Sequence, residues 1–395
     1  MDFAFTPQEE AFRQDVRRWL QQTLTSAFWE EIGDEVLDGD HAWSPRFSKL
    51  LAQQGWLLIP WPKEYGGMGA TPIQLLVFCE EIAYQRAPIG AHRRGVFYAA
   101  PSLMLFGTEE NKREFLPQIA RGEGYFCWGL SEPNAGSDLA NVQTHAEEDG
   151  DDFVINGQKV WTSDAHRADY CWLLCRTDPN VPKHQGLSII AVPMKTPGVR
   201  VRPLINIVSR HHFNEVFFDN VRVPKKNIVG QKNRGWYQIA ASLDFERAGI
   251  GIMRPVGFQR TLDDLTLYIR EHGWQGVSEH RRLLHRHSLA EAAIEIQALK
   301  LLLYRVTWLV SKGQVPNVEA SMGKAFGDDL AKRLANLGMT ALGLYGQLPH
   351  GTRWAPLRGF IEHYYLQTVS AGIAGGTSEV QRNVVAQRGL GLPRS

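Results

Sequence analysis

The hydrophobic pattern of this chain changes its period twice. Apolar side chains repeat at helical spacing in residues 5–22, 45–54, 71–85 and 109–120. From about Tyr125 the spacing becomes two, as in half-buried strands, and helical spacing resumes after Val229-Gly230. With 395 residues, the chain is long enough to bury a large core. The pattern therefore predicts an α+β protein with a β region between two helical regions.

Turn signals and periodicity predict the elements inside these regions. Asn156-Gly157 lies between two β-type runs, so we expect a hairpin turn there. The acidic run 147–152 is expected to be a solvated turn. The other strand candidates are 170–176, 187–192, 199–204 and 215–223, and the later helices are 288–310, 320–344 and 378–388. We expect three domains: an N-terminal helical domain at 1–122, a β-barrel or sandwich-like domain at 123–232, and a C-terminal four-helix bundle at 233–395.

Composition excludes several classes of protein. Lys and Arg number 43 against 42 Asp and Glu, so no global charge draws the chain to nucleic acid or to an anionic membrane. The N-terminus lacks the basic start and apolar run of a signal peptide, and no stretch is apolar enough to span a membrane. Four cysteines are too few for a disulfide framework and are expected to be buried thiols: Cys79, Cys127, Cys171 and Cys175. We expect a cytoplasmic protein.

One carboxylate falls where an apolar side chain is expected. In residues 235–251, Ile239, Leu243, Glu246 and Ile250 share one stripe of a helix. A carboxylate on such a face is either neutralised by a partner or raised in pKa toward neutral pH, which suits a general base. From this stretch alone, a structural ion pair and a catalytic base both stay open.

Two short motifs have the chemistry of a ligand site. Residues 128–138 combine glycines, hydroxyls and free backbone N–H groups near a turn defined by proline, which suits an anionic or heteroaromatic ligand. Residues 159–163 place Trp161 beside two hydroxyls, which fits a planar cofactor such as a flavin. Each motif is also compatible with an ordinary turn and a buried tryptophan.

These motifs resemble those of the acyl-CoA dehydrogenase family, and the resemblance extends along nearly the whole chain. The matching segments, in the family's order, are WPKEYGGMG (61–69), FGTEENKREFLPQIARGE (106–123), LSEPNAGSD (130–138), NGQKVWTS (156–163), FNEVFFDNVRVP (213–224) and GGTSEVQR (375–382). The resemblance implies FAD, an acyl-CoA substrate, α,β-dehydrogenation and an electron-transferring flavoprotein as acceptor.

Site residues follow from the resemblance position by position. Leu130, Ser131, Trp161 and Ser163 would line the flavin, and Thr377 would contact it from the C-terminal domain. Ser137 would lie near the pantetheine or the ribityl chain, and Arg247 would meet the CoA phosphates or hold its helix in register. No metal is implied, because His285 and His287 lack the spacing of ligands. The cluster of His92, Arg93 and Arg94 is expected to be a solvated surface.

The chain departs from the family at Gly375. Many members carry the catalytic glutamate at this position, whereas a second group, similar to the isovaleryl and long-chain enzymes, carries it in a Leu-Asp-Leu-Glu-Arg pattern. This chain reads Leu-Asp-Phe-Glu-Arg at 243–247. The resemblance therefore implies that Glu246 removes the α-proton while hydride passes to flavin N5. The N–H of Gly375 would remain as a contact to the thioester oxygen.

A second departure concerns the contact between subunits. Residues 270–282 lack the Arg-x-x-Phe-Gly element that reaches a neighbouring subunit's FAD, and residues 344–348 are also altered. This pattern resembles a heteromeric branch acting on steroid side chains, in which unlike subunits share one FAD. We expect either a homotetramer with divergent loops or a heterotetramer with a related subunit. A non-catalytic FAD-sharing subunit and a flavin monooxygenase remain alternatives, and the acyl group is not disclosed.

Overall fold

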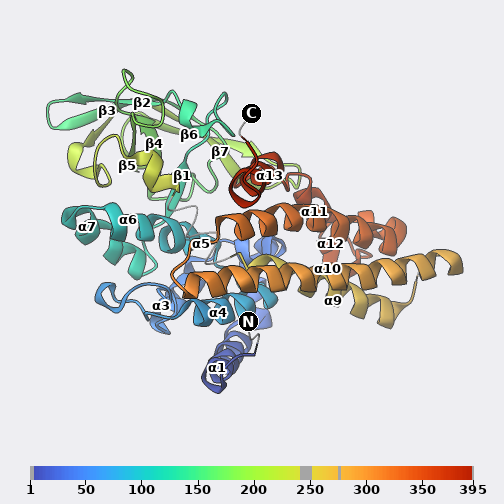
Figure 1. Ribbon diagram of the computed structural model, residues 1–395. Helices are drawn as coiled ribbons and strands as arrows, with labels where there is room; N and C mark the ends of the chain where they lie inside the picture. Colours follow the sequence, from blue (N-terminus) through green and yellow to red (C-terminus); the bar gives the residue numbers. More distant parts are fainter. Residues whose placement is uncertain (1–3, 241–250, 275–276, 394–395) are drawn as a thin grey trace. The chain divides into compact units, whose positions relative to one another are not determined.

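The computed structural model describes residues 4–240, 251–274 and 277–393. The chain forms two compact units, which we describe separately. The helical unit comprises Met1–Ala42, Thr71–Pro88 and Arg247–Ser395, and the sheet unit comprises Trp43–Ala70 and Ile89–Glu246. Figure 1 shows helical N-terminal and C-terminal parts and a middle β-sheet part, which confirms the predicted fold class.

Long helices make up most of the helical unit. Helices α9, α10 and α11 pack against one another, and α12 and α13 pack on α11 (Figure 1). Leu265 and Ile269 of α9 meet Ala341 and Ile361 in a shared apolar core. The helices are α1 (Pro7–Thr23), α2 (Ser26–Ile32), α4 (Pro72–Tyr84), α9 (Met253–His272), α10 (Glu279–Ser311), α11 (Asn317–Leu342), α12 (Phe360–Thr368) and α13 (Ser378–Val384).

Local sequence explains where several helices begin. Thr6 and Thr71 each accept a hydrogen bond from the third helical N–H, and the residue at that position bonds back to the threonine, which forms capping boxes. Thr108 caps α7 (Glu109–Ala120) in the same way, with Asn111 as the returning side chain. Thr108 therefore marks the start of the helix expected at 109–120.

Buried charges connect α1, α4 and α10 inside the helical unit. Arg13 of α1 contacts Glu80 of α4 at 2.7 Å, and Lys300 of α10 contacts the same carboxylate at 2.9 Å. The hydroxyl of Tyr304 donates to Glu80 at 2.6 Å. Burial, with Glu80 beside it, raises the pKa of Tyr304 well above its ordinary value. These contacts join segments that lie far apart in the sequence.

A seven-stranded sheet organises the sheet unit. The strand order is β1-β4-β2-β3-β7-β6, with β5 pairing β4, and β4 runs parallel to β1 and β2 while the other pairs are antiparallel. The strands are β1 (Phe126–Gly129), β2 (His145–Asp149), β3 (Asp152–Lys159), β4 (Tyr170–Arg176), β5 (Leu187–Pro193), β6 (Val199–Ile205) and β7 (His211–Pro224). Helices α3 (Pro45–Gln53), α5 (Gly90–Arg94), α6 (Ala100–Phe106) and α7 belong to the same unit.

The hairpin turn expected at Asn156-Gly157 is wrong. The β2–β3 turn is formed by Gly150 and Asp151, because Asp149 pairs with Asp152, and this confirms the solvated turn expected at 147–152. Asn156 and Gly157 instead lie inside β3, at an irregularity in its pairing with β7. A Cβ at Gly157 would lie 2.5 Å from Oγ1 of Thr144. Glycine is needed there for close approach, so the dipeptide does not mark a turn.

The four cysteines are buried and free, as expected. Burial raises the pKa of the Cys175 thiol to about 12, so this thiol stays protonated at neutral pH. Within the described residues, none of the helices combines the length and apolar character needed to cross a membrane.

Candidate functional site

The two motifs predicted to bind a cofactor lie together in the sheet unit. The first follows β1, where Leu130 and Ser131 leave the strand, and the second follows β3. The N–H of Val160 donates to the carbonyl of Ser131 at 2.9 Å, and Nζ of Lys159 donates to the carbonyl of Leu130 at 2.9 Å. The segments at Leu130 and Lys159, which are 29 residues apart in the sequence, therefore lie side by side.

A buried ion pair fixes these two loops. Nζ of Lys159 lies 2.8 Å from Oε1 of Glu132, and both side chains are buried. The same carboxylate accepts the backbone N–H groups of Gln143 at 2.6 Å and Thr144 at 2.8 Å. Burial alone would raise the pKa of Glu132, but the Lys159 charge and these hydrogen bonds outweigh it and hold the pKa below its ordinary value. Glu132 is therefore ionised and fully paired at neutral pH.

Trp161 presents its ring outward from a strained backbone. Its φ is 58°, in the left-handed region, and 62% of the residue's surface is exposed. The edge of the ring system contacts Phe213 at a centroid distance of 6.0 Å. Thr162 is fully buried, and Ser163 is half-buried. The second motif thus offers an exposed aromatic ring, so the alternative of a buried tryptophan is wrong, while its contact with a flavin stays a prediction.

An aspartate that contacts an arginine and a histidine follows this face. Oδ2 of Asp164 lies 2.6 Å from Arg94, and Oδ1 lies 3.3 Å from Nδ1 of His212. Burial opposes ionisation of Asp164, but the Arg94 charge and the His212 contact outweigh it and hold the pKa of the carboxyl far below its usual range.

The expectation of a solvated basic cluster at 92–94 is wrong. His92 is buried, and its Nδ1 lies 2.6 Å from Oγ of Ser48. Burial lowers the pKa of His92 to about 3, so the ring is neutral at physiological pH. Arg94 is engaged with Asp164. These contacts were not predictable from the sequence, because Ser48 and Asp164 lie 44 and 70 residues away from His92 and Arg94.

The C-terminal motif forms a glycine turn in the helical unit. Gly375 and Gly376 have φ of 69° and 87°, and the amide of Gln381 donates to both of their carbonyls. Thr377 caps α13 through its hydroxyl, which accepts from the N–H of Val380 at 3.3 Å. A Cβ at Gly375 would meet only Cε of Lys324, at 3.8 Å. A Cβ would thus meet no close neighbour among the described residues, but the left-handed φ suits glycine, and the position supplies no carboxylate.

The remaining predicted residues are distributed as follows. Ser137 is exposed, in the loop that ends at the surface ion pair between Asp138 and Lys183, 2.7 Å apart. Glu246 and Arg247 lie outside the described residues, so their predicted roles stay predictions. Residues 235–240 are helical, and Ile239 of the apolar stripe is buried. Leu130, Ser131, Ser137, Trp161 and Ser163 belong to the sheet unit, and Gly375 and Thr377 to the helical unit.

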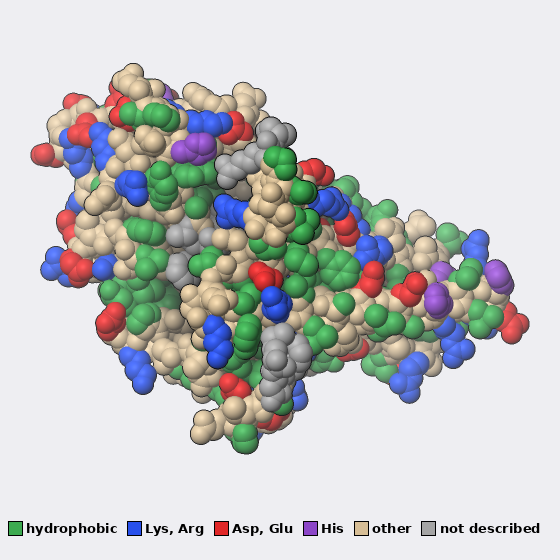
Figure 2. All heavy atoms as spheres, viewed as in Figure 1, with side chains coloured by type: hydrophobic (Ala, Val, Ile, Leu, Met, Phe, Trp, Pro, Cys, Tyr) green, Lys and Arg blue, Asp and Glu red, His purple; other side chains and the backbone are tan. Residues whose placement is uncertain are grey.

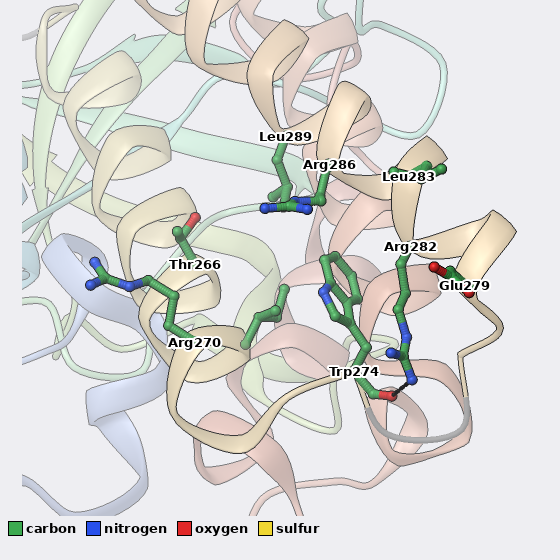
Figure 3. A pocket seen from close by; sticks show the side chains of 9 residues that line it. Thr266, Arg270, Trp274, Glu279, Arg282, Leu283, Arg286 and Leu289 are labelled. Carbon is green, nitrogen blue, oxygen red and sulfur yellow. Dashed lines mark hydrogen bonds between the residues drawn. The ribbon is translucent and has the colours of Figure 1, made fainter.

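A separate cavity of 560 Å³ lies in the helical unit, where α9 ends and α10 begins. Figure 3 shows Trp274 and three arginines around it, with Arg282 donating to the carbonyl of Trp274 at 3.5 Å. Histidine and basic side chains gather over this end of α9 and α10 in Figure 2. The lining residues are Thr266, Ile269, Arg270, Trp274, Glu279, Arg282, Leu283, Arg286 and Leu289.

Three family models match successive parts of the chain. They are the N-terminal domain of acyl-CoA dehydrogenase at residues 6–123, its middle domain at 127–221 and its C-terminal domain at 233–390. The chain belongs to the acyl-CoA dehydrogenase family. It is therefore an oxidoreductase, and the resemblance drawn from the sequence is confirmed.

Relatives of known name cover the whole length of this acyl-CoA dehydrogenase. Acyl-CoA dehydrogenase FadE26 of Mycobacterium tuberculosis (strain ATCC 25618 / H37Rv) is 34% identical over 100% of both chains. A solved structure described as "Tcur3481-Tcur3483 steroid ACAD" has a TM-score of 0.90 and 33% identity over 100% of both chains. The crystal structure of the ChsE4-ChsE5 complex from Mycobacterium tuberculosis has a TM-score of 0.86 and 34% identity, again over 100% of both chains.

FAD is the cofactor of this family, and the residues present fit it. The exposed ring of Trp161 offers a flat apolar surface, with the hydroxyl of Ser163 close by in the chain. Two buried polar atoms beside the motifs, Oγ1 of Thr162 and Nε1 of Trp128, have no hydrogen-bond partner within the described part of the chain. Buried polar groups are normally satisfied, so unpaired ones beside such a surface are consistent with a bound polar ligand.

Sequence reasoning missed several residues of this acyl-CoA dehydrogenase that build the site. Glu132 and Lys159 are opposite charges within the two motifs, and their co-occurrence was the signal that could have suggested a pair. Gln381 and Asn214 lie within matched segments but carry no chemical peculiarity in the sequence. Only their contacts in the folded chain reveal their importance.

Proposed function

We propose that this enzyme catalyses FAD-dependent α,β-dehydrogenation of an acyl-CoA thioester, with Glu246 as the base. The observation that supports Glu246 most is the turn at Gly375, a glycine in the left-handed region that supplies no carboxylate where many family members carry the base. Glu246 is the acid that the Leu-Asp-Phe-Glu-Arg segment supplies instead. Arg247, next to it, would meet the CoA phosphates or keep the helix in register.

The chemistry assigns distinct tasks to the chain's own residues. An α-proton of a thioester is a very weak acid, so the base must be desolvated and within about 3 Å of that proton. Negative charge that develops on the thioester oxygen needs a fixed donor, and the N–H of Gly375 is the proposed one. Leu130, Ser131, Trp161, Ser163 and Thr377 would hold the flavin, and Ser137 would contact the ribityl chain or the pantetheine. When bound, FAD supplies the hydride acceptor.

The substrate class and assembly are proposed from the relatives. One similar structure is described as a steroid acyl-CoA dehydrogenase and names two proteins, and the other is a complex of two proteins. We therefore propose a bulky, steroid-type CoA thioester and a heterotetramer with a related subunit that shares FAD. A homotetramer is the alternative, and an electron-transferring flavoprotein is the proposed acceptor. The division at 1–122, 123–232 and 233–395 and the cytoplasmic location stay predictions.

The cavity between α9 and α10 supports a contact with a neighbouring subunit. Arg270, Arg282 and Arg286 are among its lining residues, although the usual element is missing from this region. Guanidinium groups are suited to phosphate. We therefore propose that this surface meets the phosphates of a flavin held mainly by the partner.

Flavin bleaching tests this proposal. The protein, purified alone and co-expressed with a related subunit, is expected to be yellow in at least one form and to lose its colour anaerobically with a suitable CoA thioester. Straight, branched and steroid thioesters compared in this way identify the acyl group.

Glu246→Gln tests the base. We expect the variant to keep its flavin and to bleach at least about a hundredfold more slowly, since general-base catalysis contributes at least that much. Asp244→Asn is the matched control, because a two-residue offset places it away from the stripe of Glu246. Equal bleaching by Glu246→Gln and wild type would show that another group removes the proton.

A further inference from the structure

The segment 161–164 carries the predicted flavin contacts Trp161 and Ser163, and its first and last residues have a strained backbone. Trp161 and Asp164 both have φ of 58°, a conformation that residues with a Cβ rarely adopt. Such a conformation persists only where surrounding contacts hold it. The N–H of Thr162 donates to the carbonyl of Asn214 at 3.0 Å, and the N–H of Asp164 donates to the carbonyl of His212 at 2.8 Å. The start of β7 therefore holds this segment.

Asn214 holds Thr162 from both sides. Besides accepting its N–H, Asn214 donates from Nδ2 to the carbonyl of Thr162 at 2.9 Å. Asn214 is fully buried, as is Thr162. Because a carbonyl can only accept, the amide must direct its NH₂ group toward Thr162. The backbone carbonyl of Asn214 thus holds the peptide group between Trp161 and Thr162, and its side chain holds the peptide group between Thr162 and Ser163.

Two histidines set the orientation of that amide. Nδ2 of Asn214 also lies 3.2 Å from Nδ1 of His166, and Oδ1 lies 2.7 Å from Nε2 of His211. His166 must therefore accept at Nδ1, which requires its neutral form, and His211 must donate from Nε2. The two rings stack with centroids 3.7 Å apart. The amide's two donors and its acceptor are all engaged.

The surroundings favour neutral His166. Burial, followed by the electrostatic effects of neighbouring His211 and Arg167, lowers the pKa of His166 to about 4. A protonated ring would place an N–H against the NH₂ group of Asn214. Besides His211, the titratable and charged groups near His166 are Asp164 and Arg167. Asp164 in turn contacts Arg94 and His212.

We propose that Asn214, oriented by His166, is a positioning residue for the flavin site, because it holds the two peptide groups of Thr162 that carry Trp161 on one side and Ser163 on the other. This inference rests on the proposed flavin contacts of Trp161 and Ser163. It assigns no contact with flavin to Asn214 itself, which acts through the backbone of Thr162.

Asn214→Asp tests this proposal through FAD affinity. The carboxylate keeps the shape of the amide but turns a donor into an acceptor, which then faces the carbonyl of Thr162 and Nδ1 of His166. We expect the dissociation constant for FAD, measured by fluorescence titration of apoprotein at about pH 8, to rise roughly tenfold or more. Near pH 6 it should recover in part, because the new carboxylate favours protonated His166, which can donate.

Asn156→Asp is the matched control. Asn156 is a β3 residue that accepts the N–H of Asn220 at its Oδ1 and donates from Nδ2 to Oδ1 of Asn220 at 3.3 Å. Aspartate keeps the first contact and turns the second donor into an acceptor, as at position 214, but does so away from Thr162. The wild type and this control should bind FAD equally and should show no recovery of affinity near pH 6. Titrations use whichever assembly binds FAD, the chain alone or the chain with its co-expressed subunit.

The outcomes separate this inference from the proposed function. If no wild-type assembly binds FAD, the proposed flavin contacts are wrong. If the wild type binds and Asn214→Asp matches it at both pH values, Asn214 is not a positioning residue. Should Asn214→Asp fail to fold, His166→Phe decides: it keeps a stacked ring and removes the acceptor. We expect it to weaken FAD binding about threefold, without pH dependence, and an unchanged affinity would overturn the proposal.

Discussion

At the scale of single residues, the pair Lys159 and Glu132 connects the two motifs that face the proposed flavin. Both side chains are buried, and the two charged groups are 2.8 Å apart. Glu132 lies in the loop after β1, and Lys159 is the last residue of β3. Such a pair is stable only while both members are present, because either one alone is a buried charge without a counterion. The loops at Leu130 and Val160 depend on it, since Lys159 also bonds the carbonyl of Leu130.

Glu132→Gln is expected to lower the free energy of unfolding by about 3–5 kcal/mol at neutral pH, because it leaves the Lys159 ammonium buried without a counterion. Urea denaturation of the apoprotein measures this change. Glu147→Gln removes an exposed carboxylate on β2 and should change the stability by less than about 0.5 kcal/mol. If the two variants had the same free energy of unfolding, the buried pair would make no net contribution to stability.

The pH dependence of the same variant has a definite sign. The pKa of Glu132 is lowered by folding, so its contribution to stability is present above the ordinary value of 4.5 and is lost as pH falls through the folded-state pKa. The stability difference between the wild type and Glu132→Gln should therefore persist from neutral pH down to about pH 5 and shrink in stronger acid. A difference that stays constant into strong acid would contradict the assigned ionisation of Glu132.

At the scale of elements, β3 shows where local signals are sufficient and where they fail. The helix start at Thr108 was predictable because its capping side chains are near neighbours in the sequence. The strand conformation of Asn156-Gly157 was not predictable, because the need for glycine at 157 comes from Thr144, on the chain segment leading into β2. His92 and Trp161 are similar cases. Their burial or strain depends on residues far away in the sequence, which a periodic pattern does not encode.

Gly157→Ala is expected to destabilise the sheet unit by about 1–3 kcal/mol, since the new Cβ would collide with Thr144 and φ is 147°. Thermal unfolding of the apoprotein measures this effect. Gly257→Ala, in the interior of α9, is the matched control. A Cβ there meets nothing within 4 Å, so the protein should gain up to about 1 kcal/mol. An unchanged melting temperature for Gly157→Ala would show that β3 can shift at no cost.

At the scale of the whole molecule, the start of α10 exposes two neighbouring leucines that a monomer in water would be expected to bury. Leu283 and Leu284 are 62% and 55% exposed, and Leu283 lines the cavity that ends α9. Trp274 stacks on His285 in the same region, with ring centroids 5.7 Å apart. Exposed apolar groups surrounded by arginines are typical of surfaces that another protein covers. This region is therefore where the proposed assembly with a second subunit should be sensitive to mutation.

The double variant Leu283→Lys and Leu284→Lys tests this surface. Two added charges would have to be desolvated at an interface, so we expect the native mass to shift from that of the proposed tetramer toward smaller species, with far-UV circular dichroism unchanged. Ile207→Lys, which changes an equally exposed apolar residue in the sheet unit, is the control and should leave the mass unaltered. If the double variant also lost FAD while its subunits stayed folded, the start of α10 would be linked to cofactor retention as well as to assembly. A tetramer as stable as the wild type would place the subunit interface elsewhere on the molecule.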